Sequence, residues 1–195
     1  MNLNKRVLKA LLFAALAALL FSCSSSRSRY NFDFPFSDKL AYPSDSSFSV
    51  AIPQGWYQVE DNECNCNNIL LMRNGLKASL NLIPVAMDNV SAGRIEKEPL
   101  TDLIKYSKII KSQKTGISLR IIEKENFKSD EIPVRAYKYL NSKGFEQRVV
   151  VFSIGGNYFE LNGNSATTNK DVLNDLFAAQ NSLIKMIGIN KHTKY

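Results

Sequence analysis

The sequence predicts an α+β domain in which an antiparallel sheet packs against two main helices. Three observations predict this class. Several short segments alternate apolar and polar residues, as half-buried strands do. The last of these segments are joined by connections so short that the strands must pair antiparallel. Two longer segments gather their apolar residues on one arc of a helix.

Length and composition limit the function classes. A chain of 195 residues suits one domain with a tail, and a hydrophobic content of 45% excludes wholesale disorder. The sequence has a single histidine, His192, close to its end. We therefore do not expect a histidine-dependent catalytic triad or a multi-histidine metal site.

Residues 1–22 have the pattern of an export signal. Three basic residues precede a continuous apolar run over 10–21. Twelve apolar residues would make about 18 Å of helix, which is too short for a bilayer core of about 30 Å. A cleaved secretory signal is therefore favoured over a spanning helix.

The end of the apolar run, Leu20-Phe21-Ser22-Cys23, resembles a bacterial lipobox. The resemblance implies cleavage before Cys23 and acylation of that residue, although Phe21 departs from the usual residue. Stable anchoring needs two or more acyl chains, which a lipidated Cys23 would supply. Ser24 gives no acidic retention signal, which favours the outer membrane. The alternative is an ordinary signal peptide followed by an incidental cysteine.

The predicted organisation has four parts. They are the signal (1–22), the lipidated cysteine with a flexible tether (23–46), the α+β domain (47–189) and a polar tail (190–195). Serines and arginines over 24–29 are too polar to fold, and 30–46 shows no clear periodicity. We expect 30–46 to lie over the domain surface or to remain extended.

The net charge gives no support for nucleic acid as a partner. Removal of 1–22 takes away three of the 25 basic residues and none of the 18 acidic ones, so +7 becomes +4. This charge is mild and spread out, and the sequence has no basic cluster or recognition motif.

The domain begins with a strand over 48–52, which Pro53-Gln54-Gly55 ends. Strands over 69–72 and 79–85 follow, with a turn at Asn74-Gly75 between them. Trp56 is expected to pack beside the first strand, as lone aromatic residues usually do. Trp56 and Tyr57 are also the candidate partner-binding surface.

A helix is predicted over 99–115, where Pro99 suits the first turn and Gly116 the stop. Its four lysines at a spacing of three wind around the helix, so we expect solvated side chains rather than a binding stripe. Strands follow over 117–124, 134–141, 146–154 and 158–162. A closing helix begins at a capping box over Thr168–Asp171 and extends to Ile187, and Gly188 stops it.

The opening Phe48-Ser49-Val50-Ala51-Ile52-Pro53-Gln54-Gly55-Trp56 is similar to that of the PsbP/DcrB-like (Mog/PsbP-like) domains. The finish also resembles theirs, with Tyr158–Leu161 as a last strand and a helix that contains Phe177 and Ser182. The resemblance covers 47–187, mainly by element order. It implies an α-β-α sandwich around a curved sheet and a non-catalytic role in binding or supporting protein assemblies. It transfers no functional residues.

The loop over 60–68 departs from the family pattern and contains Cys64 and Cys66. With Cys23 acylated, these two could form a local disulfide, because an exported protein meets an oxidising compartment. They could instead remain unpaired thiols or bind a metal, although zinc normally requires four ligands. The sequence is compatible with all three states of this cysteine pair.

Acidic residues could serve hydrolysis, and the candidates are Glu123, Glu125, Asp130 and Glu131. Because they alternate with lysines, we expect them on the surface. Neither a glycine-rich phosphate loop nor a nucleophile elbow occurs, so no cofactor is predicted. The expected function is a membrane-anchored envelope lipoprotein that binds a protein partner without catalysis. The alternatives are a histidine-free carboxylate hydrolase or a thiol or metal protein that uses Cys64 and Cys66.

Overall fold

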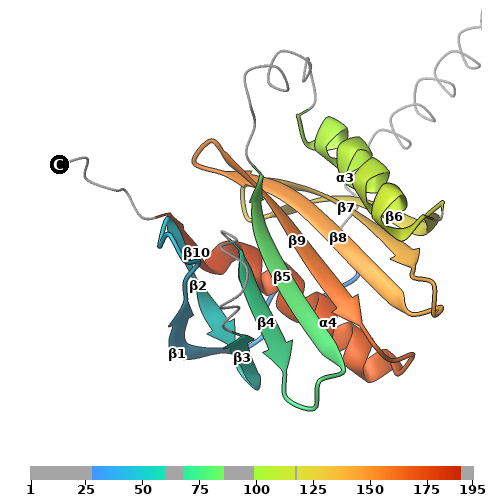
Figure 1. The fold of residues 1–195 in the computed structure, drawn as a ribbon. Coiled ribbons are helices and arrows are strands. Elements are labelled where there is room, and N and C mark those ends of the chain that lie inside the picture. Colours follow the sequence, from blue (N-terminus) through green and yellow to red (C-terminus); the bar gives the residue numbers. More distant parts are fainter. Residues whose placement is uncertain (1–27, 60–67, 86–98, 117, 190–195) are drawn as a thin grey trace, which may run out of the picture.

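The computed structural model describes residues 28–59, 68–85, 99–116 and 118–189, which form two sheets and two α-helices (Figure 1). Seven antiparallel strands make the larger sheet, in the order β3-β4-β5-β9-β8-β7-β6. Its strands are β3 (Trp56–Val59), β4 (Ile69–Arg73), β5 (Ala78–Val85), β6 (Arg120–Ser129), β7 (Ile132–Leu140), β8 (Glu146–Ile154) and β9 (Asn157–Ser165).

One helix lies on each face of the larger sheet (Figure 1). Helix α3 (Pro99–Thr115) packs on β7 and β8, and helix α4 (Lys170–Leu183) packs on the opposite face. The arrangement is an α-β-α sandwich, so the predicted α+β class with two main helices is confirmed. None of the helices in the described ranges is long and apolar enough to cross a bilayer.

The smaller sheet was not expected from the sequence. It consists of β1 (Phe36–Ala41), β2 (Phe48–Pro53) and β10 (Ile187–Ile189), with β2 in the centre. Helix α4 ends at Leu183 and continues through the short 3₁₀-helix η1 (Ile184–Met186) into β10. The closing helix is therefore shorter than predicted, because Ile187 and Ile189 pair with β2 instead.

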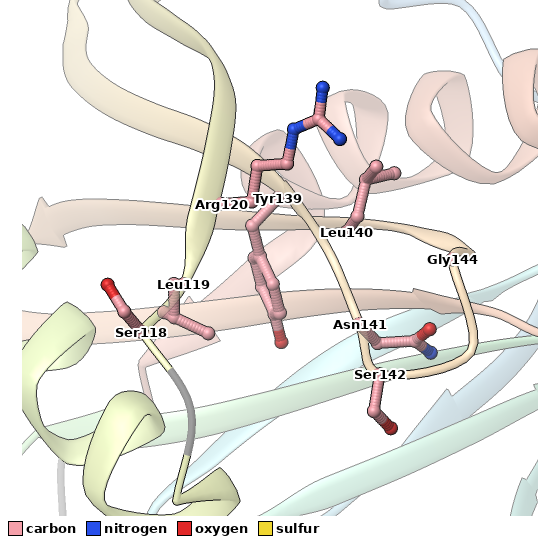
Figure 2. A pocket seen from close by; sticks show the side chains of 8 residues that line it. All are labelled: Ser118, Leu119, Arg120, Tyr139, Leu140, Asn141, Ser142 and Gly144. Atoms are coloured by element: carbon pink, nitrogen blue, oxygen red, sulfur yellow. The ribbon is translucent and has the colours of Figure 1, made fainter.

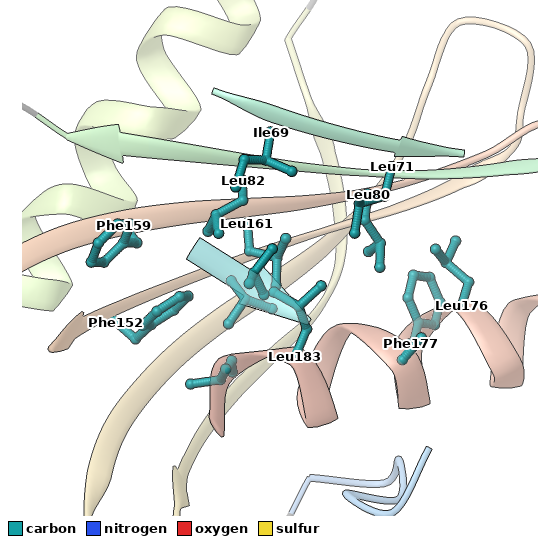
Figure 3. Packing of buried hydrophobic residues seen from close by; sticks show 14 of the residues in the cluster. Ile69, Leu71, Leu80, Leu82, Phe152, Phe159, Leu161, Leu176, Phe177 and Leu183 are labelled. Carbon is teal, nitrogen blue, oxygen red and sulfur yellow. The ribbon is translucent and has the colours of Figure 1, made fainter. Parts of the chain in front are cut away.

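The main core lies between the larger sheet and α4 (Figure 3). Large side chains from β4, β5, β8 and β9 point toward the helix, whose Leu176, Phe177 and Leu183 are fully buried. A second, smaller core lies beneath α3 and contains Leu103 and Tyr137. Two separate cores explain why both faces of the sheet carry apolar residues.

Local sequence signals set the ends of the elements. Helix α4 begins after Asn169, whose side-chain oxygen accepts hydrogen bonds from the backbone N–H groups of Asp171 and Val172. This asparagine cap replaces the predicted capping box, since it satisfies the same exposed N–H groups. The β8–β9 turn uses Gly155 and Gly156 at φ +58° and +82°, which residues with side chains adopt rarely.

The segment over 30–46 packs against the domain, which is the first of the two arrangements expected for it, although the predicted organisation grouped it with the tether. Tyr30, Phe32, Phe34 and Phe36 pack against the main core. Their spacing of two residues is that of an extended chain with one buried face. Within the described residues, contacts with the domain extend back to Ser28, whose hydroxyl donates a hydrogen bond to Glu125.

Candidate functional site

A groove lies between α3 and the end of β5, above β9, and we call it the α3 groove. Its volume is about 260 Å³. Most of its wall is apolar, and its polar side chains come from two elements, helix α3 and strand β9. The apolar wall includes Ile83, Val85, Leu103, Tyr106, Ile110 and Val151.

An ion pair lies in the floor of the α3 groove. Lys111 Nζ of α3 lies 3.0 Å from Glu160 Oε1 of β9. Both side chains are largely buried, with exposed fractions of 20% and 15%. The pair exists because Lys111 falls on the inner arc of α3 and Glu160 points to the same face of the sheet as Val151, its partner in register.

Hydroxyl groups extend this ion pair into a network. Ser107, one helical turn before Lys111, hydrogen-bonds to the Glu160 carboxylate. The Ser107 hydroxyl also lies 2.9 Å from the Tyr137 hydroxyl. Because a serine hydroxyl carries one proton, Ser107 donates it to Glu160 and accepts a hydrogen bond from Tyr137. The Asn162 side chain adds a further hydrogen bond to Glu160.

The network keeps its groups in their ordinary protonation states at neutral pH. Burial opposes ionisation of Glu160, but the Lys111 charge and the hydrogen bonds outweigh it and hold its pKa below the usual 4.5. Burial raises the pKa of Tyr137 and of Tyr139, so both phenols remain neutral. The groove thus offers fixed charges and hydrogen-bonding groups rather than a proton poised for transfer.

The lowered pKa of Glu160 predicts an acid-sensitive contribution to stability. Glu160→Gln should reduce the free energy of unfolding by about 1–3 kcal/mol at pH 7, because it removes one partner of a buried pair. A carboxylate with a lowered pKa stabilises the fold above its unfolded pKa and stops doing so as pH falls through the folded value. The difference between wild type and variant should therefore shrink from pH 5 to pH 3.

Urea unfolding at each pH measures this difference. The matched control is Glu131→Gln, since the Glu131 side chain is 96% exposed and should show almost no effect at any pH. A Glu160→Gln deficit that stays constant down to pH 3 would contradict the assignment.

A second cavity of about 300 Å³ lies beside the β7–β8 turn. Figure 2 shows Tyr139 pointing toward Leu119 and the turn at Asn141, whereas Arg120 points the other way. The titratable side chains of this second cavity do not point toward a common position. The α3 groove is therefore the better candidate for a site with specific chemistry.

On the other face of the sheet, a buried arginine holds the N-terminal segment. Arg148 is fully buried, and its Nε and Nη2 atoms donate to Glu125 at 2.8 and 3.0 Å. Ser28 donates to Glu125 at 2.9 Å, and the Asn181 side chain donates to Ser28 and to the Tyr30 carbonyl at 3.0 and 3.1 Å. We call Ser28, Tyr30, Glu125, Arg148 and Asn181 the N-terminal clasp.

Aromatic and ionic contacts strengthen the clasp. The Arg148 guanidinium lies 5.1 Å from the centre of the Tyr30 ring, within the range of a cation–π interaction. The Tyr30 hydroxyl accepts a hydrogen bond from Lys138, which also pairs with Glu123. Burial lowers the pKa of Lys138, but the hydrogen bonds to Glu123 and Tyr30 outweigh burial and raise it overall.

The two residues of the predicted partner-binding surface lie on opposite faces of β3. Trp56 lies in the main core with 7% of its surface exposed, as its packing interpretation predicts. Tyr57 points to the opposite face of β3 and is 40% exposed. Only Tyr57 of this pair is therefore accessible to a partner.

The predicted cysteine sites lie outside the described residues. Cys23, Cys64 and Cys66 all fall in ranges that the structure does not describe, as do 1–22 and His192. Within the described ranges, no group of three or more His, Cys, Asp or Glu side chains could hold a metal ion.

Two of the four candidate hydrolytic acids are on the surface as expected. Asp130 and Glu131 are exposed and pair with lysines. The expectation is wrong for Glu125, which is 7% exposed because it neutralises Arg148. Glu123 is partly buried beside Lys138.

Sequence reasoning missed the groove network entirely. Lys111 is one of the four helix lysines that were expected to be solvated, which is wrong for this residue because it pairs with Glu160 beneath the helix. Glu160 belongs to no motif. The signal available was alternation in Tyr158–Leu161, which places Glu160 on the face opposite the main core.

Comparison with known proteins identifies the fold. No protein-family model matches the chain, and no curated protein matches it by sequence. The solution structure of cyanobacterial PsbP (CyanoP) from Synechocystis superposes with a TM-score of 0.54 at 12% identity, covering 78% of this chain and 92% of that one. A crystal structure from Bacteroides thetaiotaomicron covers 80% of this chain and 50% of that one at 13% identity, with a TM-score of 0.39. The PsbP-like fold implied by the sequence resemblance is confirmed.

Proposed function

We propose that this PsbP-like domain belongs to a bacterial envelope lipoprotein, acylated at Cys23, which binds an envelope protein and has no catalytic role. The observation that carries the proposal is the N-terminal clasp. It fixes the chain to the folded domain from Ser28 onward, only five residues after the predicted acylation site.

The short distance along the chain restricts where the domain can sit. Five residues span at most about 18 Å when fully extended. The clasp would thus keep the domain close to the bilayer rather than at the end of a long tether. An anchored domain near the membrane meets membrane-bound partners at a raised local concentration, so a weak contact can be sufficient.

Binding rather than catalysis is supported by the state of the buried charges. Glu160 is ionised and paired with Lys111, and Glu125 is paired with Arg148. Both carboxylates already have partners that hold them in place. The lowered pKa of Glu160 suits a fixed charge, whereas general acid–base chemistry needs a pKa near the working pH.

Tyr57 marks the surface that we propose for the partner. On the same face of the sheet, Tyr57 lies opposite Met72 and Val59 lies opposite Leu70 in the β3–β4 register. Helix α3 covers β7 and β8, so no described helix covers this face of β3 and β4 (Figure 1). A half-exposed apolar patch with a tyrosine suits a protein contact.

Site-specific photo-crosslinking in cells tests the binding role. A benzophenone amino acid at position 57 should yield a discrete crosslinked envelope protein. Tyr42 gives a matched control, since it is 43% exposed against 40% for Tyr57. Tyr42 lies between β1 and β2, where its backbone N–H and carbonyl form hydrogen bonds with the Gln58 side chain. That side chain points away from the face that carries Tyr57. The proposal fails if position 57 gives no adduct, or the same adducts as position 42.

The anchor is tested by fractionating the envelope of cells that carry wild type or Cys23→Ser. Wild type should sediment with membranes, in the outer-membrane fraction, and be extracted only by detergent. Processing at Cys23 should be lost in the variant. Equal distribution and processing of the two proteins would refute the lipid anchor.

A further inference from the structure

We propose that the α3 groove binds a medium-chain aliphatic carboxylate, with its carboxylate at Lys114 and its hydrocarbon chain along the apolar wall. This inference stands apart from the proposed function, since it depends neither on Cys23 nor on a protein partner. It follows from the shape, the wall and the charges of the groove.

The shape and the wall select a small ligand with an apolar body. A volume of about 260 Å³ is slightly below the roughly 300–1,000 Å³ usual for sites of drug-sized ligands, so the groove suits a smaller molecule. The wall is mainly aliphatic and comes from rigid elements, β5 and β8 on one side and α3 on the other. A chain of several methylenes would replace water along Val85, Ile110 and Val151.

The charges select an anionic head. Glu160 is the acidic side chain that lines the groove, and Lys111 already neutralises it. Lys114 also lines the groove, is exposed, and forms no ion pair within the described part of the chain. Among the described residues Lys114 thus has no acidic partner, and its positive charge next to an apolar surface complements a carboxylate and repels an ammonium group.

The binding affinity should increase with the length of the hydrocarbon chain of the ligand. Each buried methylene contributes about fourfold to affinity in area-based transfer estimates. Octanoate, with two more methylenes, should then bind about sixteenfold more tightly than hexanoate. Octylamine, which has a similar chain and the opposite charge, should bind much more weakly than octanoate.

Calorimetric titration of the full chain in lipid nanodiscs tests the proposal, with empty nanodiscs as the blank. Lys114→Gln should weaken octanoate binding about fivefold, which is the upper range for an exposed ion pair. Lys105→Gln is the matched control on the same helix. Lys105 pairs with Asp102 and does not line the groove, so octanoate affinity should be unchanged.

A second variant, Ile83→Trp, should fill the groove and abolish octanoate binding while thermal unfolding shows a folded protein. If that variant does not fold, the octanoate affinities of Lys114→Gln and Lys105→Gln alone test the proposal. The proposal is overturned if no saturable binding occurs, if octylamine binds as tightly as octanoate, or if both lysine variants behave alike.

Discussion

Arg148→Met should lower the free energy of unfolding by about 3–5 kcal/mol, because it leaves the Glu125 carboxylate buried without its partner. Arg148 is fully buried and makes two short hydrogen bonds to Glu125. It also donates to Gln180 and Asn181, both at 2.9 Å, so α4 loses a contact to the sheet as well. Chemical denaturation monitored by circular dichroism measures the loss.

Two further variants separate charge burial from general damage. Removing both partners in Arg148→Met with Glu125→Leu should recover much of the stability, since no uncompensated charge remains in the interior. Lys128→Met breaks the exposed pair with Glu131 and should change stability by less than about 1 kcal/mol. A single Arg148→Met variant as stable as wild type would show that the pair is dispensable.

Phe177→Ala should cost about 3–5 kcal/mol of stability, which is the usual range for a large aromatic side chain removed from a core. Phe177 is fully buried in α4, and its ring lies 5.0 Å from the Tyr30 ring. The variant should therefore loosen the N-terminal segment in addition to the main core. Limited proteolysis near residue 30 should accelerate relative to wild type.

The control for this core variant is Tyr106→Ala on α3. The Tyr106 side chain is 60% exposed, and surface substitutions of this kind usually change stability by less than about 0.5 kcal/mol. If the two variants lose the same stability, the main core is not where the structure places it.

The bounds of elements with a strong local signal could be predicted from the sequence. Pro99–Thr115 and Glu146–Ile154 have the predicted bounds. The first has helical periodicity and is followed by Gly116, whereas the second contains a continuous apolar run and lies between turns with Gly144 and with Gly155-Gly156. Strand β6 begins three residues later than predicted and extends to Ser129, because it follows the length of its partner β7. Strand ends depend on pairing, which the local sequence does not contain.

The smaller sheet and the clasp depend on contacts between distant parts of the chain. Ile187–Ile189 is a short apolar segment that continues a helical pattern, and only pairing with β2 makes it a strand. Arg148 lies in the polar start of its strand, Glu146-Gln147-Arg148, which suggests exposure, yet it is fully buried and hydrogen-bonds to Glu125 and Asn181. The alternating aromatics at 30, 32, 34 and 36 were a readable signal for the packed N-terminal segment.

The most direct test of the account is the intact mass of the mature protein purified from bacterial membranes. A chain that starts at Cys23 and carries the mass of at least two acyl chains is the predicted result. Such a protein would have its lipid five residues from the clasp at Ser28. A mature protein that starts at another residue, or one whose Cys23 carries no acyl mass, would contradict the central claim.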